Sequence, residues 1–589
     1  MRWGCNVRVV RLQVKNFRGF EELQVRPRSH VVLMGPPGGG RSDLIEALSR
    51  VLEPEASRAP VTEGDFHWGR VGQPVEVEVV VGDLGNELEQ RFLDRLEVWD
   101  DGEGSLVEES ESAGEIDKEG CSFVLRVCYM GEWDVGEQRG AGWVYYPKSS
   151  DAEAEAFDYV RQPDIEALGY VRMRWGQGRP LDLGVRSVFR KVLESAEGGD
   201  FADAVNRYLE GVETAAGGFT RASQVRRALE EVMEPLRVLF GLQEEEVSDL
   251  VRFTPEGGAV SGLLRSVAPS LSLPGEPSWL PVNRCGSTVR TLFGLAETLA
   301  LARASAGIVA IDDLGDGLDS ASALHMSSAL MGVANQVWIT TRLPSVAETF
   351  DMSDVVRLGR IPGGGRLAYQ AEVPSSKAER IAARHWGRNV LPCLSYDGVV
   401  VVEGPHDLAA LHGLALRMLK DSGVALPNSL GVAMISCDAG GGGGSPSVPR
   451  LTGLAREMGL WTVGVIDWDK AANADAVLQS ALAGSDTVVR FPEGVAIERA
   501  LVEGIPEDVL REVLEQTIRT GGIQGVADLG GLQEDGLKEV AVEVLKRGGG
   551  LHGLFVEALP PKVIPPLARA VLERSVSAVV EQTRGLIQL

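Results

Sequence analysis

Four acidic residues follow two apolar segments in the C-terminal third of the chain. Glu403 ends the run VVVVE, Asp407 comes four residues later, and Asp467 and Asp469 close the segment VGVIDWD. A separation of four residues is one helical turn, and a separation of two puts side chains on the same side of an extended chain, so each pair can face one site.

Carboxylates gathered at strand ends repel one another unless a cation is bound. Two magnesium or manganese ions, about 4 Å apart, would neutralise them and clamp the attacking and leaving oxygens of a phosphodiester. The spacing therefore predicts a metal-dependent phosphodiester hydrolase. Ordinary acids at strand ends are the alternative.

A glycine-rich segment near the N-terminus has the spacing of a phosphate-binding loop. GPPGGGRS matches the pattern GxxxxGK[ST], with Arg41 in the lysine position. Gly35, Gly38 and Gly40 would let backbone N–H groups converge on phosphate oxygens, and Ser42 would supply a hydroxyl for magnesium. A plain turn between a strand and a helix is the alternative.

Asp312 and Asp313 follow the apolar run GIVAI. A carboxylate at that strand end can hold the hydration shell of magnesium, and the second can orient the attacking water. With the glycine loop, this pair predicts a site for ATP with Mg²⁺. Two solvated acids are the alternative.

The elements that must position these groups alternate between strands and helices. Continuous apolar runs are typical of buried parallel strands, and SDLIEALSRVL has apolar residues at helical spacing. The pattern predicts an α/β fold. Helical patterns over 185–250 carry no catalytic signature and indicate an insertion for self-association. The runs that predict strands lie at 30–34, 75–84, 307–314, 336–341 and 398–404.

Composition limits the classes of function. The 589 residues include 58 Lys and Arg against 84 Asp and Glu, and a net charge of -26 excludes a continuous basic surface for nucleic acid. Six cysteines without a CxxC pair and seven histidines argue against a zinc site or a disulfide framework. Because no apolar signal core or membrane-length run occurs, we expect a soluble cytoplasmic protein without membrane contact.

The N-terminal motifs resemble RecF/SMC-like ABC ATPases. KNFRGFEEL followed by the glycine loop resembles their N-terminus, and DLGDGLD and ITTRLP resemble the D-loop and the switch segment. CGSTVRTLFGLAETLALA stands in the place of the signature motif. The resemblance implies that Gly286 and Ser287 contact the γ-phosphate across a dimer.

Three residues depart from that family's pattern. Arg41 replaces lysine, Asp313 replaces the usual glutamate, and Arg342 replaces the switch histidine. Arginine keeps the positive charge of lysine but carries it on a planar guanidinium. Aspartate is one methylene shorter than the glutamate it replaces. A displacement of about 1 Å at a reacting water can cost about 100-fold in rate. We therefore expect nucleotide binding to persist and hydrolysis to be weak or absent.

E-G-x-x-D followed by D-x-D resembles the TOPRIM domain. An ABC ATPase followed by TOPRIM resembles the OLD (overcoming lysogenization defect) nucleases, the group that includes the Gabija antiphage nuclease subunit. The resemblance implies that Glu498 is a further metal ligand and that Lys562 stabilises charge on the scissile phosphate. A solvated helix acid and an exposed loop lysine are the respective alternatives.

The expected architecture is an ABC/SMC-like ATPase core with a helical dimerisation insertion, followed by a C-terminal TOPRIM α/β domain. Metal ligands are expected at Glu403, Asp407, Asp467, Asp469 and Glu498, and at Ser42 and Asp312 for the nucleotide's magnesium. The expected boundaries are 1–150 and 281–370 for the ATPase lobes, 151–280 for the insertion, 371–392 for a linker and 393–589 for TOPRIM.

The hypothesis is a nucleotide-gated DNA endonuclease that uses Mg²⁺ or Mn²⁺ in antiphage defence. It would act on double-stranded DNA as a homodimer or higher homo-oligomer, with a helicase-like partner protein as a further possibility. The alternative is a non-catalytic, ATP-responsive scaffold. A topoisomerase would need a nucleophilic tyrosine, and its expected product is relaxed closed circles.

Overall fold

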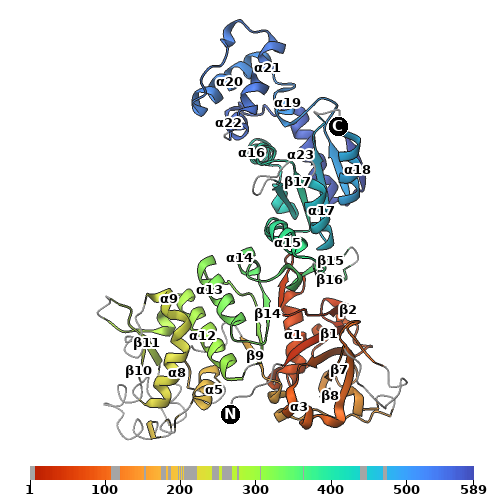
Figure 1. Cartoon of the computed structure of the whole chain (residues 1–589), viewed down its shortest axis with the longest axis vertical. Coiled ribbons are helices and arrows are strands. Elements are labelled where there is room, and N and C mark those ends of the chain that lie inside the picture. Colours follow the sequence, from red (N-terminus) through yellow and green to blue (C-terminus); the bar gives the residue numbers. More distant parts are fainter. Residues whose placement is uncertain are drawn as a thin grey trace. The chain divides into compact units, whose positions relative to one another are not determined.

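The computed structural model covers the whole chain and divides it into two compact units, Met1–Met34 with Gly38–Ala368, and Tyr369–Leu589 with Gly35–Pro37 (Figure 1). The structure describes residues 7–107, 120–151, 154–173, 181–183, 187–196, 198, 201, 203–204, 222–241, 251–254, 268–274, 278–305, 307–361, 364–373, 375–437, 447–468, 474–548 and 550–589.

The first unit contains an antiparallel sheet in the order β2-β1-β4-β7-β5-β6, with β8 paired to β7. Its inward side chains are apolar and alternate with polar ones, as in β4, because one face of the sheet covers the core. The strands are Arg8–Phe17 (β1), Phe20–Val25 (β2), Val75–Gly82 (β4), Leu96–Asp100 (β5), Ser105–Leu106 (β6), Cys121–Asp134 (β7) and Arg139–Tyr145 (β8).

A second sheet in this unit has the order β16-β15-β3-β14-β13-β9. From β15 to β9 its neighbours pair in parallel, and β3, β14 and β13 are buried at every position, as expected of strands covered on both faces. The strands are Val31–Met34 (β3), Tyr170–Met173 (β9), Ile308–Ile311 (β13), Gln336–Thr340 (β14), Val355–Arg360 (β15) and Arg366–Gln370 (β16).

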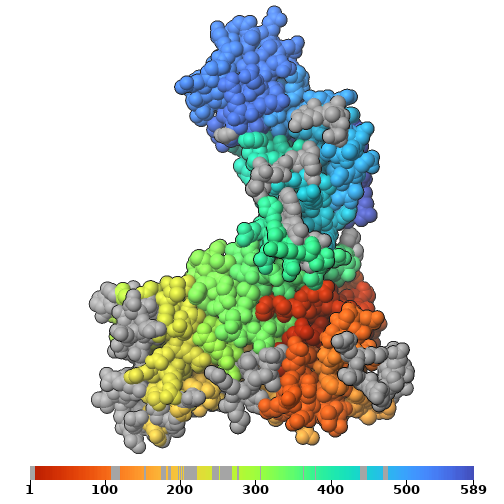
Figure 2. All heavy atoms as spheres, in the orientation of Figure 1, coloured from red at the N-terminus to blue at the C-terminus, as the bar shows by residue number. Residues whose placement is uncertain are grey.

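Helices flank this sheet, and α12 contacts α5 and α8. Figure 2 shows the surfaces of the N-terminal segment and of the segment around residues 310–360 adjoining within this unit. The helices are Arg41–Leu52 (α1), Pro54–Ser57 (α2), Gly85–Arg91 (α3), Gln162–Ala167 (α4), Val188–Ser195 (α5), Ser223–Met233 (α8), Arg237–Phe240 (α9), Ser287–Ser305 (α12), Ser320–Met331 (α13) and Pro344–Ala347 (α14).

The segment expected as a helical insertion is only partly described. It contains α5, α8 and α9, and also a small antiparallel sheet that the sequence did not predict. That sheet consists of Val251–Thr254 (β10), Ala268–Leu271 (β11) and Leu280–Pro281 (β12).

The second unit is built on a parallel sheet in the order β18-β17-β19-β20-β21. The strands are Gly398–Val402 (β17), Val432–Ser436 (β18), Trp461–Ile466 (β19), Thr487–Arg490 (β20) and Gly585–Gln588 (β21). Val400, Val402, Val463, Val465 and Val489 alternate along three strands and pack into one core with α16 and α19–α23. The C-terminal unit is thus an α/β unit, as the sequence predicted.

The helices of this unit include one in the expected linker. Residues 377–390 form α15, which contacts α17 and so belongs to the unit. No helix in the described part of the chain is long and apolar enough to cross a membrane. The helices are Lys377–Val390 (α15), Pro405–Ser422 (α16), Val448–Glu457 (α17), Ala474–Gly484 (α18), Ile497–Val502 (α19), Glu507–Gly521 (α20), Glu534–Lys546 (α21), Leu551–Ala558 (α22) and Pro566–Val580 (α23).

Candidate nucleotide and metal sites

The glycine loop joins β3 to α1, as predicted. Gly40 stands directly before α1 in the left-handed region, with φ of 95°. A Cβ on Gly40 would lie 2.7 Å from the Phe20 ring and 2.7 Å from the Arg366 guanidinium, so only glycine fits. The first N–H groups of α1 are therefore presented at the end of a buried strand, the usual place for a phosphate.

Ser42 and Asp312 meet beside this helix start. The Ser42 hydroxyl donates to Asp312 Oδ1 at 3.0 Å, and the Thr340 hydroxyl donates to the same oxygen at 2.6 Å. The ends of β13 and β14 and the start of α1 thus bring together a hydroxyl and a carboxylate. These are hard oxygen ligands of the kind that Mg²⁺ binds.

Arg41 turns toward the end of β14. Its Nη1 donates to the Thr341 carbonyl at 3.0 Å. Burial lowers the pKa of Arg41, although the carboxylates of Asp313 and Asp312 counteract that effect. The guanidinium is therefore held by the protein's own backbone in this structure.

The two other departures from the family pattern contact each other. Arg342 Nη2 lies 3.1 Å from Asp313 Oδ2, and this hydrogen bond raises the pKa of Arg342. Asp313 adopts a left-handed φ of 49°, and its N–H donates to the Thr340 hydroxyl. The carboxylate expected to orient water is thus engaged in an ion pair. Because Arg342 is 66% exposed, solvent screens the attraction between the two charges.

The signature-like segment begins α12. Gly286 directly precedes the helix and Ser287 is its first residue, and both are exposed. The Thr288 hydroxyl donates to the Gly317 carbonyl at 2.7 Å, which joins this segment to the D-loop-like turn. Asp319 ends that turn and caps α13 by accepting the N–H groups of Ala321 and Ser322.

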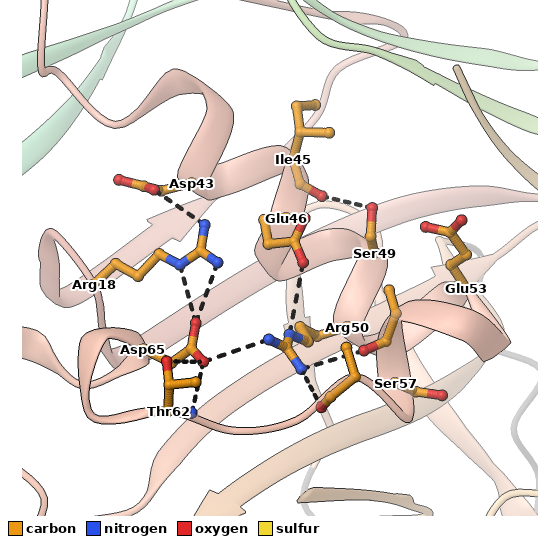
Figure 3. Close-up of polar contacts among 12 residues, drawn as sticks. Arg18, Asp43, Ile45, Glu46, Ser49, Arg50, Glu53, Ser57, Thr62 and Asp65 are labelled. Atoms are coloured by element: carbon orange, nitrogen blue, oxygen red, sulfur yellow. Dashed lines mark hydrogen bonds and ion pairs between the residues drawn. The ribbon is translucent and has the colours of Figure 1, made fainter. Parts of the chain in front are cut away.

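An ion-pair network fastens α1 to the KNFRGF segment (Figure 3). Arg18 lies 3.1 Å from Asp65 and 3.4 Å from Asp43, and Arg50 reaches Asp65 from the other side at 3.5 Å. Arg366 adds a 2.6 Å contact to Asp43. Sequence reasoning used KNFRGF only as a family signal, and it missed this structural role because the acidic partners are distant in sequence.

In the second unit, the Glu403 carboxylate contacts the backbone of Asp467. The Asp467 N–H donates to Glu403 Oε1 at 2.9 Å, so the ends of β17 and β19 place these residues side by side. Asp407 lies in the first turn of α16 and accepts the Gly404 N–H at 2.9 Å. The pKa of Asp407 is raised to about 7, mainly by burial and also by the negative charges of Glu403 and Glu498, against the lowering effect of the Gly404 hydrogen bond.

Glu498 joins the same acidic neighbourhood from α19. Its Oε1 lies 3.5 Å from Nε2 of His552, a fully buried residue of α22. Burial opposes ionisation of Glu498, but the contact with His552 and the charge of Lys546 leave its pKa lowered. His552 also stacks on His406, with centroids 4.9 Å apart. Neither histidine was predicted, and no local spacing links His552 to this edge of the sheet.

The side chains at this sheet edge are of the type that hard divalent cations bind. Glu403, Asp407, Asp467 and Glu498 offer only carboxylate oxygens, and their mutual repulsion is the cost that a cation would remove. No group of three or more His, Cys, Asp or Glu side chains has metal-binding geometry within the described ranges. Asp469 lies outside those ranges, as does the glycine run 440–444.

Lys562, which was expected near the scissile phosphate, contacts α16 through its backbone. Its left-handed backbone N–H donates to Asp421 Oδ2 at 2.9 Å, and Asp421 is in the last turn of α16. Asp407 is in the first turn, fourteen residues earlier, which is about 21 Å along a helix. The Lys562 backbone is thus fastened to the end of α16 that lies away from Asp407.

Comparisons with known proteins match parts of the chain. A family described as "Protein of unknown function (DUF2813)" matches residues 8–79, which include the glycine loop and α1. No curated protein matches.

Solved structures of SMC head domains are among those to which this chain is similar. The head bound to the C-terminal winged-helix domain of ScpA has 12% identity and a TM-score of 0.35, covering 62% of this chain and 98% of that chain. The head from Thermotoga maritima has 15% identity and a TM-score of 0.30, covering 62% and 100%. The head derived from Pyrococcus furiosus, with an extended coiled coil, has 12% identity and a TM-score of 0.37, covering 64% and 98%.

Proposed function

We propose that this protein is a nucleotide-gated, divalent-metal-dependent DNA endonuclease resembling the OLD nucleases. The observation that carries the proposal is the hydrogen bond from the Asp467 amide to Glu403, because it joins the two halves of the carboxylate motif at one sheet edge. Asp407 and Glu498 approach the same edge from α16 and α19.

The carboxylates are the metal ligands in this proposal. Glu403, Asp407, Asp467 and Asp469 would hold Mg²⁺ or Mn²⁺, with Glu498 completing the set. The bound metal supplies a nucleophilic water and neutralises the phosphate. Burial and like charge raise the pKa of Asp407, and a bound cation would favour its ionised form.

The N-terminal unit would bind ATP with Mg²⁺ and control the nuclease. Ser42 and Asp312 would hold the magnesium, and Gly35, Gly38, Gly40 and Arg41 the phosphates. Since Asp313 is paired with Arg342, water activation would be poor and hydrolysis slow. Gly286 and Ser287 would complete the site from a second copy, which requires a homo-oligomer.

A plasmid assay tests the nuclease. Supercoiled double-stranded DNA is incubated with the full chain and Mn²⁺ or Mg²⁺, with and without ATP. We expect nicked and linear products from the wild type and at least about a 100-fold loss in Asp467→Asn. Asp475→Asn changes an exposed acid on α18 and is the matched control.

The outcomes separate the candidate functions. No cutting by the wild type, or equal cutting by Asp467→Asn, favours the non-catalytic scaffold. Relaxed closed circles would indicate a topoisomerase. A change in rate with ATP supports gating, and indifference to ATP counts against it. A role in antiphage defence in the cytoplasm, with or without a helicase-like partner, follows from the resemblance and belongs to this proposal.

A further inference from the structure

Arg490 is a buried arginine, and one of its guanidinium nitrogens has no hydrogen-bond partner among the described residues. It is the last residue of β20, and 4% of it is exposed. Its Nη2 is fully buried and makes no hydrogen bond to any described residue. The guanidinium carbon lies 3.5 Å from the ring centroid of Trp468, so the fork lies against the indole.

The position of Arg490 is set by the same sheet edge that carries the carboxylates. Arg490 is opposite Ile466, the last residue of β19, and Asp467 and Trp468 follow directly. The segments that follow β19 and β20 stay side by side, because two backbone hydrogen bonds join them. The Trp468 carbonyl accepts the Gly494 N–H at 2.8 Å, and the Trp468 backbone N–H donates to the Val495 carbonyl at 3.3 Å. The guanidinium therefore lies beside the residue adjacent to Asp467.

Such a side chain needs an explanation. Arginine stays charged at all accessible pH, and an unpaired charge taken out of water is strongly unfavourable, which an aromatic face offsets only in part. Arg50 is buried to the same extent, but it pairs with Asp65 and donates to the carbonyls of Ala56 and Ala59. Arg490 has no comparable partner among the described residues, so an anion from outside the chain is the natural complement.

We propose that Arg490 binds the DNA phosphate at the carboxylate edge, the role that the sequence suggested for Lys562. This inference rests on the proposed nuclease function. A cluster of carboxylates repels a phosphodiester, and a planar guanidinium can bind two of its oxygens and offset part of that repulsion. The guanidinium is stacked on Trp468, so little conformational entropy of the Arg490 side chain is lost when the phosphate binds.

The test compares Arg490→Met and Arg490→Lys with the wild type. Met has similar length and no charge, so thermal unfolding of Arg490→Met is expected at an equal or higher temperature, because an unpaired buried charge is removed. Mn²⁺ affinity, measured by calorimetry, should stay within about twofold, since Arg490 is not a metal ligand. Arg569→Met removes an exposed arginine of α23 and is the control.

DNA readouts distinguish this role from a structural one. In Ca²⁺, which takes the same oxygen ligands, Arg490→Met should bind duplex DNA about tenfold more weakly. In Mn²⁺ its single-turnover nicking should fall at least about 100-fold, and Arg490→Lys should recover part of that loss. Unchanged nicking by Arg490→Met overturns the assignment. Lower thermal stability together with lost Mn²⁺ binding also overturns it, because those results describe a structural arginine.

Failure of the nuclease itself would be recognised separately. If the wild type neither binds Mn²⁺ nor nicks DNA, the proposed nuclease fails, and Arg490 is then judged with inorganic phosphate alone. Thermal stabilisation of the wild type but not of Arg490→Met by phosphate supports an anion site. An equal response of both proteins overturns it.

Discussion

Glu297 offers a test of the first unit that does not depend on function. It lies in the middle of α12, is 6% exposed, and has the fully buried Leu295, Ala296 and Leu299 around it. Its carboxylate accepts the Leu181 N–H. Burial raises the pKa of Glu297 to about 8; the Leu181 hydrogen bond opposes this rise and the charge of Asp182 adds to it.

The shift has a definite consequence for stability. The unfolded carboxyl ionises near its ordinary pKa of 4.5, whereas the folded one keeps its proton up to about 8. The contribution of Glu297 to folding stability therefore falls as the pH rises from 4.5 to 8 and is constant above that. The difference of about 3.5 units corresponds to about 5 kcal/mol at 1.36 kcal/mol per unit.

Glu297→Gln removes the ionisation and keeps an oxygen for the Leu181 N–H. We expect little change in the free energy of unfolding at pH 5 and a gain of up to about 5 kcal/mol at pH 9. Urea unfolding, followed by hydrogen exchange of α12 peptides, reports on this unit directly. Glu348→Gln changes an exposed carboxylate of the same unit and is the control. A difference between variant and wild type that does not grow from pH 5 to pH 9 would refute the reasoning.

Three further predictions concern function. Replacing Arg342 by His removes the ion pair with Asp313, and replacing Asp313 by Glu lengthens the carboxylate expected to orient water. The double variant should raise steady-state phosphate release from ATP at least about tenfold. An unchanged rate would show that the ion pair is not what limits hydrolysis. Gly40→Ala should abolish binding of a fluorescent ATP analogue. Gly69→Ala is the control and should retain binding, because Gly69 also has a left-handed backbone but an added Cβ there contacts no other atom. Loss of binding in both variants would indicate general destabilisation. Lys562→Ala should nick plasmid within about twofold of the wild-type rate, because the loop is fastened about 21 Å along α16 from Asp407, and a large loss would contradict that placement.

Local sequence patterns were enough to predict the main elements near the candidate sites. Continuous apolar runs predicted β3, β13, β14 and β17, and the structure confirms them at these positions. The glycine loop before α1 could also be predicted, because neighbouring residues determine where a helix starts and whether a strand is buried. The side-by-side placement of Glu403 and Asp467 also followed, since parallel strands end at one edge of a sheet.

Contacts between distant segments were decided only by the tertiary structure. His552 reaches Glu498 from 54 residues away, and Arg490 meets Trp468 only because β20 lies beside β19. The small β10–β12 sheet and the pairing of Arg342 with Asp313 were likewise unpredicted. The physical reason is that the types and spacing of residues determine which side chains lie on one face of their own helix or strand. The direction of a whole element, such as α16, depends on how all the other elements pack around it.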